Sequence, residues 1–250
     1  MKNHPYYRFR LVGPAVLAGL LASGAAGAEN TDTSTPNQPN VSAGVTQTKN
    51  TEEAREATEQ VSAATHVISS MKQQAGVESL LERANGLFIV PKYGRGAAVV
   101  GARGGEGVLV VRNEDSWSGP AFYDYGGLSI GAQAGGKGGS LVMLLMSERA
   151  VERFKGDADF SVNADAGLTI AEYSEAAQAS LPNKDIVVWS DTEGLFAGAA
   201  IGVTGVRRDT DDNRAYYNQA ATVEQIFMGS VTNPHAQELH DELPDRVAAR

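Results

Sequence analysis

The sequence predicts an α+β protein with a curved or barrel-like antiparallel sheet that is packed by N-terminal and C-terminal helices. Apolar residues at helical spacing occur towards the two ends of the chain, and strand-like apolar runs fill the middle. Of the 28 glycines, 15 lie between Gly86 and Gly139. Because glycine in strands marks bulges, bends and close backbone approach, the sheet is expected to curve. Helices at the ends and strands between them favour α+β over alternating βαβ units.

The first 28 residues have the pattern of an export signal. A positive segment with Lys2, Arg8 and Arg10 precedes an uncharged apolar stretch, and Ala26-Gly27-Ala28 supplies the small residues of a cleavage site. The apolar stretch is shorter than the ~20 residues of a spanning helix and is interrupted by glycine and proline. We therefore predict cleavage after Ala28 and a periplasmic or secreted protein, with membrane association as an option.

The remaining chain divides into a linker, one domain and a tail. Residues 29–50 are rich in Thr, Asn, Pro, Gln and Ser, a composition that buries too little apolar surface to fold, and predict a flexible linker. Residues 51–243 are predicted to form the domain, and residues 244–250 a C-terminal tail.

Charge and cysteine content exclude several classes of function. Cleavage of the signal lowers Lys plus Arg from 21 to 18 against 30 Asp plus Glu, so the mature net charge is −12. Such acidity argues against sequence-independent binding of nucleic acid, which needs a broad basic surface. The absence of cysteine excludes disulfides and thiolate chemistry.

The first predicted helix starts at Thr51 and ends near Gly76. Its apolar residues, from Ala54 through Val61 and Ile68 to Ala75, recur three and four apart and form one face. The opposite face is acidic rather than basic, which favours docking on the protein's own core over a membrane surface.

The other elements follow in order along the chain. Further helices are expected at Val77–Ala84, Glu148–Lys155, Val223–Met228 behind a Thr222/Gln225 capping box, and after Asn233-Pro234. Strands are expected at Leu87–Val90, Ala97–Ala102, Gly107–Arg112, Ala121–Tyr125, Leu128–Gln133, Leu141–Met146, Phe160–Ala171, Asp185–Ser190 and Leu195–Val206. Pro91 is expected to stop the first strand, and residues 103–106 to form the turn of a hairpin.

Several patterns resemble catalytic motifs without their context. Gly127 to Gly131 fits the G-x-S-x-G pattern around Ser129, and Asp191 and His235 follow in the order of an α/β-hydrolase triad. The residues after Gly131 favour no helix, which the nucleophile elbow requires. Gly131 to Lys137 fits G-x-x-x-x-G-K, but glycine replaces the Mg²⁺-binding hydroxyl. We predict no enzyme, and a serine hydrolase using Ser129 stays as the third hypothesis.

No metal or cofactor is predicted. His235 and His240 are five apart, which does not place two imidazoles on one helical face. Asp209, Asp211 and Asp212 lack the rest of a calcium loop and are interpreted as a solvated turn.

An ordered set of segments resembles the SYLF domain of bacterial envelope proteins and eukaryotic membrane-traffic adaptors. The set spans roughly Thr51 to Leu243, and its members are Leu80-Leu81 with Ala84-Asn85-Gly86, Ile89-Val90-Pro91, Gly101 to Leu109, Trp117-Ser118 with Pro120 to Tyr123, Gly127 with Gly131 and Gln133, Leu144-Leu145-Met146, Ala164-Asp165-Ala166, Gly194 to Gly198, and Tyr216-Tyr217 with the Thr222 to Gly229 helix. The resemblance implies binding of phospholipid or phosphoinositide head groups at the cell envelope without catalysis.

The best candidates for an anionic head group are Lys92, Arg95 and Arg103, with Lys137 in the glycine-rich loop as a fourth. Between Gly86 and Asn113 the charges are these three cations and Arg112 against Glu106, a local +3 in an acidic protein. The predicted partner is an anionic phospholipid or membrane surface, and no cofactor is involved. The alternative is an envelope structural or protein-interaction module without lipid specificity.

Overall fold

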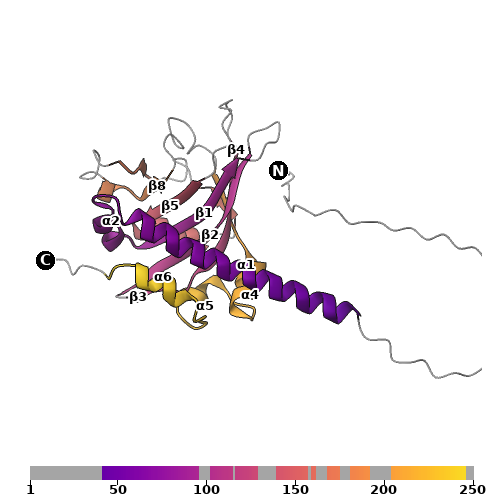
Figure 1. Cartoon of the computed structure of the whole chain (residues 1–250). Coiled ribbons are helices and arrows are strands. Elements are labelled where there is room, and N and C mark those ends of the chain that lie inside the picture. Colours follow the sequence, from indigo (N-terminus) through magenta and orange to yellow (C-terminus); the bar gives the residue numbers. More distant parts are fainter. Residues whose placement is uncertain are drawn as a thin grey trace, which may run out of the picture. The chain divides into compact units, whose positions relative to one another are not determined.

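The computed structural model describes residues 41–95, 102–114, 116–128, 139–156, 159–161, 168–174, 181–191 and 204–245. In this part of the chain six α-helices accompany a nine-stranded sheet that curls into a half-barrel, which confirms the predicted α+β class (Figure 1). The helices are α1 (Val41–Met71), α2 (Val77–Arg83), α3 (Glu148–Gly156), α4 (Thr210–Tyr217), α5 (Val223–Phe227) and α6 (Ala236–Glu242).

The strands are β1 (Gly86–Arg95), β2 (Ala102–Asn113), β3 (Ser116–Trp117), β4 (Ala121–Leu128), β5 (Gly139–Leu145), β6 (Asp159–Ser161), β7 (Ile170–Glu172), β8 (Ile186–Ser190) and β9 (Thr204–Arg208). Their order is β6-β9-β4-β2-β1-β5-β8-β7, with β3 paired to β2. Neighbours are antiparallel except β7 and β8, which run parallel at one edge.

Helix α1 lies across the sheet, with α4 and α6 beside it (Figure 1). Its buried side chains include Ala57, Val61, Ile68 and Met71, and the helix contacts β1 and β2, which confirms that the predicted apolar face docks on the core. The helix begins at Val41, ten residues before the predicted start. Once a helix is nucleated, each added residue gains one hydrogen bond, so it extends beyond its packed face until a breaker such as a proline intervenes.

Strand β1 does not stop at Pro91, as the sequence pattern predicted, but continues to Arg95. The register of β1 shifts between Ile89 and Gly94 against β2, and between Val90 and Tyr93 against β5. A bulge of this kind accommodates proline, whose nitrogen has no hydrogen to donate to the ladder.

The predicted hairpin turn at residues 103–106 is wrong, because β2 runs without interruption through these residues. The glycines instead allow β1 and β2 to approach each other closely. A methyl group at Gly107 would lie 2.6 Å from Phe88 Cε2, and one at Gly105 would lie 2.7 Å from Val90 Cγ1. The expectation that glycine marks close backbone approach is therefore confirmed, although its position in a turn is not.

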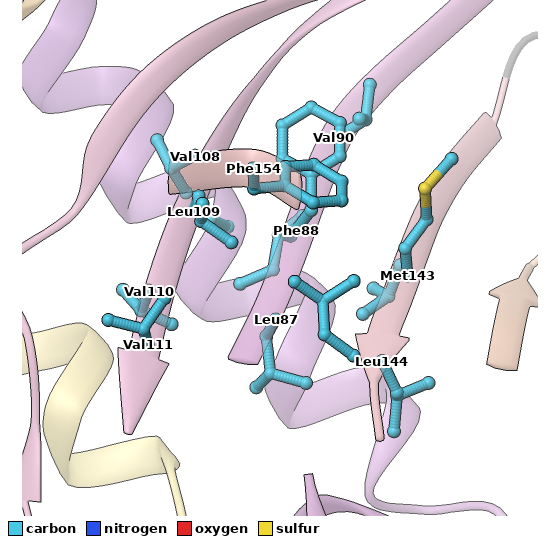
Figure 2. Packing of buried hydrophobic residues seen from close by; sticks show 14 of the residues in the cluster. Leu87, Phe88, Val90, Val108, Leu109, Val110, Val111, Met143, Leu144 and Phe154 are labelled. Atoms are coloured by element: carbon cyan, nitrogen blue, oxygen red, sulfur yellow. The ribbon is translucent and has the colours of Figure 1, made fainter. Parts of the chain in front are cut away.

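The core lies on the central strands β2, β1 and β5, whose Val, Leu and Phe side chains are buried (Figure 2). Phe154 of α3 packs against the sheet with its ring centroid 5.4 Å from that of Phe88. The Tyr123 hydroxyl donates a hydrogen bond of 2.9 Å to the Phe154 carbonyl. These contacts fix α3 against the centre of the sheet.

Asp185 ties three segments together next to β8. It is 7% exposed, and its carboxylate accepts hydrogen bonds from Ser147, Arg149 and Thr169 at 2.6–2.7 Å. Burial opposes the charged form, but these donors outweigh it and hold the pKa of Asp185 well below its usual range. This carboxylate is therefore a structural anchor for the start of α3.

The C-terminal helices follow local capping rules. The Thr222/Gln225 capping box of α5 is present as predicted. Helix α4, in contrast, was not predicted, since Asp209, Asp211 and Asp212 were interpreted as a solvated turn. The Asp209 carboxylate accepts hydrogen bonds from the backbone nitrogens of Asp211 and Asp212 at 3.0 and 2.9 Å, so the acidic run is the capped start of a helix.

Candidate functional site

The candidate site is the end of the β1–β2 pair that carries three of the four predicted cations. Lys92 is exposed on β1 just after Pro91. Arg95 and Arg103 are Cα partners across the two strands, and the neighbouring pair is Gly94 with Gly104. Directly opposite positions in an antiparallel pair are about 5 Å apart. The backbone register thus brings Arg95 and Arg103 together. Lys92 lies three residues before Arg95 on β1, and Lys137 lies outside the described residues.

Arg112 contributes to the local charge of +3 in the sequence, but its side chain makes contacts outside the candidate site. Its guanidinium donates to the carbonyl oxygens of Leu81, Ala84 and Pro244 at 3.1 Å each. It also stacks over the ring of Trp117 at 4.1 Å, and the Trp117 indole donates to the same Pro244 oxygen. Arg112 therefore fastens α2 and the C-terminal segment to β2, so the local charge of the candidate site falls to +2.

Carboxylates border the candidate site on β2 and β4. Glu106 is the Cα partner of Asp124, and Asp124 pairs with Arg207 of β9. Desolvation of its carboxyl group, followed by neighbouring carboxylates, raises the pKa of Glu106, and Lys92 acts in the opposite direction. Burial followed by nearby carboxylates raises the pKa of Asp212 to about 7. The positive end of the sheet therefore lies beside a region of crowded negative charge.

Of the three residues in the hydrolase hypothesis, the structure describes Asp191 and His235. Ser129 lies outside the described residues, as does the G-x-x-x-x-G-K segment. Both carboxylate oxygens of Asp191 accept hydrogen bonds from Ser140, at 2.8 and 3.1 Å, which joins β5 to β8. His235 stands at the start of α6, and its backbone nitrogen donates to Asn233. Within the described ranges, Asp191 therefore has a role in strand pairing.

The remaining histidine and acidic side chains give no metal centre in the part of the chain that the structure describes. His240 Nε2 is 2.8 Å from the Ser118 carbonyl oxygen and links α6 to the segment after β3. A cavity of about 120 Å³ beside Lys72, Glu78 and Leu81 is smaller than the ~300 Å³ of typical ligand pockets. Among the described helices, none combines the length and apolarity that a bilayer crossing requires.

The described part of the chain is thus a curled sheet covered by helices, with predicted cations at one end of a glycine-rich strand pair. The family model Ysc84, described as "Las17-binding protein actin regulator", matches residues 126–245. This match and the curated relatives described next support membership of the SYLF-domain (Ysc84) family.

Curated relatives cover the same domain in longer proteins. Protein YSC84 of Saccharomyces cerevisiae is 28% identical over 163 residues, which are 63% of this chain and 35% of that protein. SH3 domain-containing YSC84-like protein 1 of Bos taurus is 26% identical over 169 residues, 66% of this chain and 49% of that protein. LAS seventeen-binding protein 3 of Saccharomyces cerevisiae is 26% identical over 163 residues, 63% of this chain and 35% of that protein. The chain spans about a third to a half of these relatives, whose names describe binding or regulatory proteins.

Proposed function

We propose that this protein is a non-enzymatic lipid-binding protein that recognises anionic phospholipid head groups at the cell envelope. The observation that carries the proposal is the register of β1 and β2, which places Arg95 opposite Arg103. Like charges directly opposite each other destabilise a strand pair unless an anion compensates them. A phosphate group between the strand ends supplies that anion.

Glycine supports the same proposal through the backbone. Gly94 and Gly104 are cross-strand partners next to the two arginines. Because glycine has no side chain, a head group can approach the main chain closely at these positions.

Liposome flotation tests the proposed function. Wild-type protein should float with phosphatidylglycerol-rich vesicles and remain unbound with phosphatidylcholine vesicles. Raising the salt from about 0.1 M to about 1 M should weaken the binding, because the screening length falls from about 10 Å to about 3 Å. Equal binding to both vesicle types would contradict recognition of an anionic head group.

A second candidate function is that of a protein-interaction module of the envelope. The observation in its favour is the family description, which names the binding of a protein, Las17, for its characterised members. Such a module has no reason to distinguish lipids, so failure to float with either vesicle type would favour it over the lipid proposal.

We also propose that the chain is exported, on the strength of the positive segment, the apolar stretch and the Ala26-Gly27-Ala28 site in the first 28 residues. Protein isolated from the periplasm should then begin at Glu29. N-terminal sequencing is the measurement, and a protein that still begins at Met1 would refute the proposed cleavage.

A further inference from the structure

Helix α1 is attached to the rest of the domain unevenly along its length. Towards its C-terminal end, Ile68 and Met71 are fully buried. Further towards the N-terminus the buried residues are Ala57, Val61 and Ala64, and no side chain among residues 50–56 is buried. Since the stabilisation from burial grows with apolar area, the alanine-rich half gains much less from packing than the other half.

Carboxylates crowd the junction of α1 with α4 and β2, which the helix contacts, and with β4, the strand beside β2. They come from four elements and interact through their charges: Glu53 and Glu56 of α1, Glu106 of β2, Asp124 of β4, and Asp209 and Asp212 at the start of α4. Glu106 and Asp124 are direct cross-strand partners, an arrangement that is destabilising when both are charged.

Fewer cations face this junction. Lys92 of β1 acts on Glu106, and Arg207 of β9 forms an ion pair with Asp124. Arg214 pairs with Asp211 on the exposed side of α4 at 3.4 Å. Gln60 lies one turn beyond Glu56 on α1, and its buried Nε2 atom has no hydrogen-bond acceptor among the described residues. Among the described residues, the carboxylates at this junction thus outnumber the cations that face them.

We propose that the junction of α1 with β2, β4 and α4 is a pH-sensitive latch for the N-terminal half of α1. Repulsion among ionised carboxylates loosens the helix around and above neutral pH. Protonation removes this repulsion and fastens the helix as the pH falls.

The direction of this pH dependence follows from proton linkage. The pKa of Asp212 is raised to about 7 and that of Glu106 is also raised, in each case by desolvation first and by neighbouring carboxylates second. If α1 lifts away, water enters and these pKa values return towards the usual ~4. The closed state therefore binds protons more tightly. Its added stability is fully present below about pH 4 and is lost as the pH rises through about 7.

Hydrogen exchange of the mature protein tests the latch. The protection factor, which already corrects for the intrinsic pH dependence of exchange, should fall on the order of tenfold for residues 57–64 between about pH 5 and about pH 8. Amides of β1 serve as the internal reference, because global unfolding would affect both regions together. An equal protection factor at the two pH values for residues 57–64 would overturn the proposal.

Isosteric variants assign the effect to the junction. Asp212→Asn should remove most of the pH dependence, and Glu106→Gln, a milder change at an exposed position, should reduce it. Glu172→Gln removes an exposed carboxylate from β7, outside the junction, and should leave the pH dependence of the protection factor unchanged. If both junction variants fold and keep the full pH dependence of the wild type, the carboxylates do not form a latch. None of these readouts requires lipid.

Discussion

The variant in which Lys92, Arg95 and Arg103 are all replaced by glutamine should bind anionic vesicles about a hundredfold more weakly than the wild type. Each cation near an anionic surface contributes about 1 kcal/mol, and three independent contributions amount to about two factors of ten in the dissociation constant. Glutamine removes the charge at each position and keeps a polar side chain there. Flotation over a series of lipid concentrations measures the two constants.

A second triple variant provides the control for net charge. Arg83, Lys155 and Lys184 lie on or next to other elements, α2, α3 and β8, so replacing them with glutamine removes the same three charges from outside the candidate site. This variant should bind within a few-fold of the wild type. If both variants lose affinity equally, binding depends on total charge, and if neither loses affinity, the basic end of β1 and β2 is an ordinary surface.

Replacement of Gly105 by alanine should destabilise the fold by about 2–3 kcal/mol, a typical cost of forcing extra atoms into a packed site. The new methyl group would lie 2.7 Å from Val90 Cγ1 and closer still to the Lys92 carbonyl oxygen, which belongs to the backbone and cannot rotate away. For a domain of this size the melting temperature should fall by roughly 5–10 °C. Calorimetry or circular dichroism checks the shift.

Gly156→Ala is the matched control for that substitution. A methyl group at Gly156, the last residue of α3, meets no atom within 4 Å. The variant should be as stable as the wild type or slightly more stable, because alanine lowers the entropy of the unfolded chain. Equal melting temperatures for Gly105→Ala and the wild type would show that β1 and β2 do not need glycine for their close approach.

Local sequence signals predicted the elements that depend on local physics. The apolar spacing of α1 identified the face that docks on the core, and the Thr222/Gln225 pair identified the capped start of α5. The bounds of α2, α3 and β8 fall within one residue of their predicted positions. In these segments the periodicity or the capping side chain is itself the cause of the structure.

The errors occurred where tertiary contacts override local preference. Gly104 and Gly105 have the composition of a turn, but β2 continues through them. At Gly105, β1 approaches so closely that a methyl group would collide with Val90 and the Lys92 carbonyl oxygen. Pro91 stays within β1 because the strand has a bulge there, where the ladder does not need the N–H group that proline lacks. Helix α4 escaped prediction because three aspartates in five residues resemble a solvated loop, although the first of them caps a helix.

The candidate site could be predicted only in part from the sequence. Lys92, Arg95 and Arg103 stand near glycines in the sequence, and the structure pairs Arg95 with Arg103. The removal of Arg112 from the group could not, because its acceptor carbonyls come from residues 28, 31 and 132 positions away. The acidic junction beside the site likewise unites residues of α1, β2, β4 and α4, which no local pattern connects.

The most direct test of the central claim is to map where a lipid head group binds. Backbone amide shifts of the protein should be recorded by NMR during titration with a short-chain anionic phospholipid. The account predicts the largest shifts at residues 92–95 and 103–106, with little change in α6 and little response to a zwitterionic lipid of the same chain length. Shifts confined to α2 or α6, or equal responses to the two lipids, would contradict it.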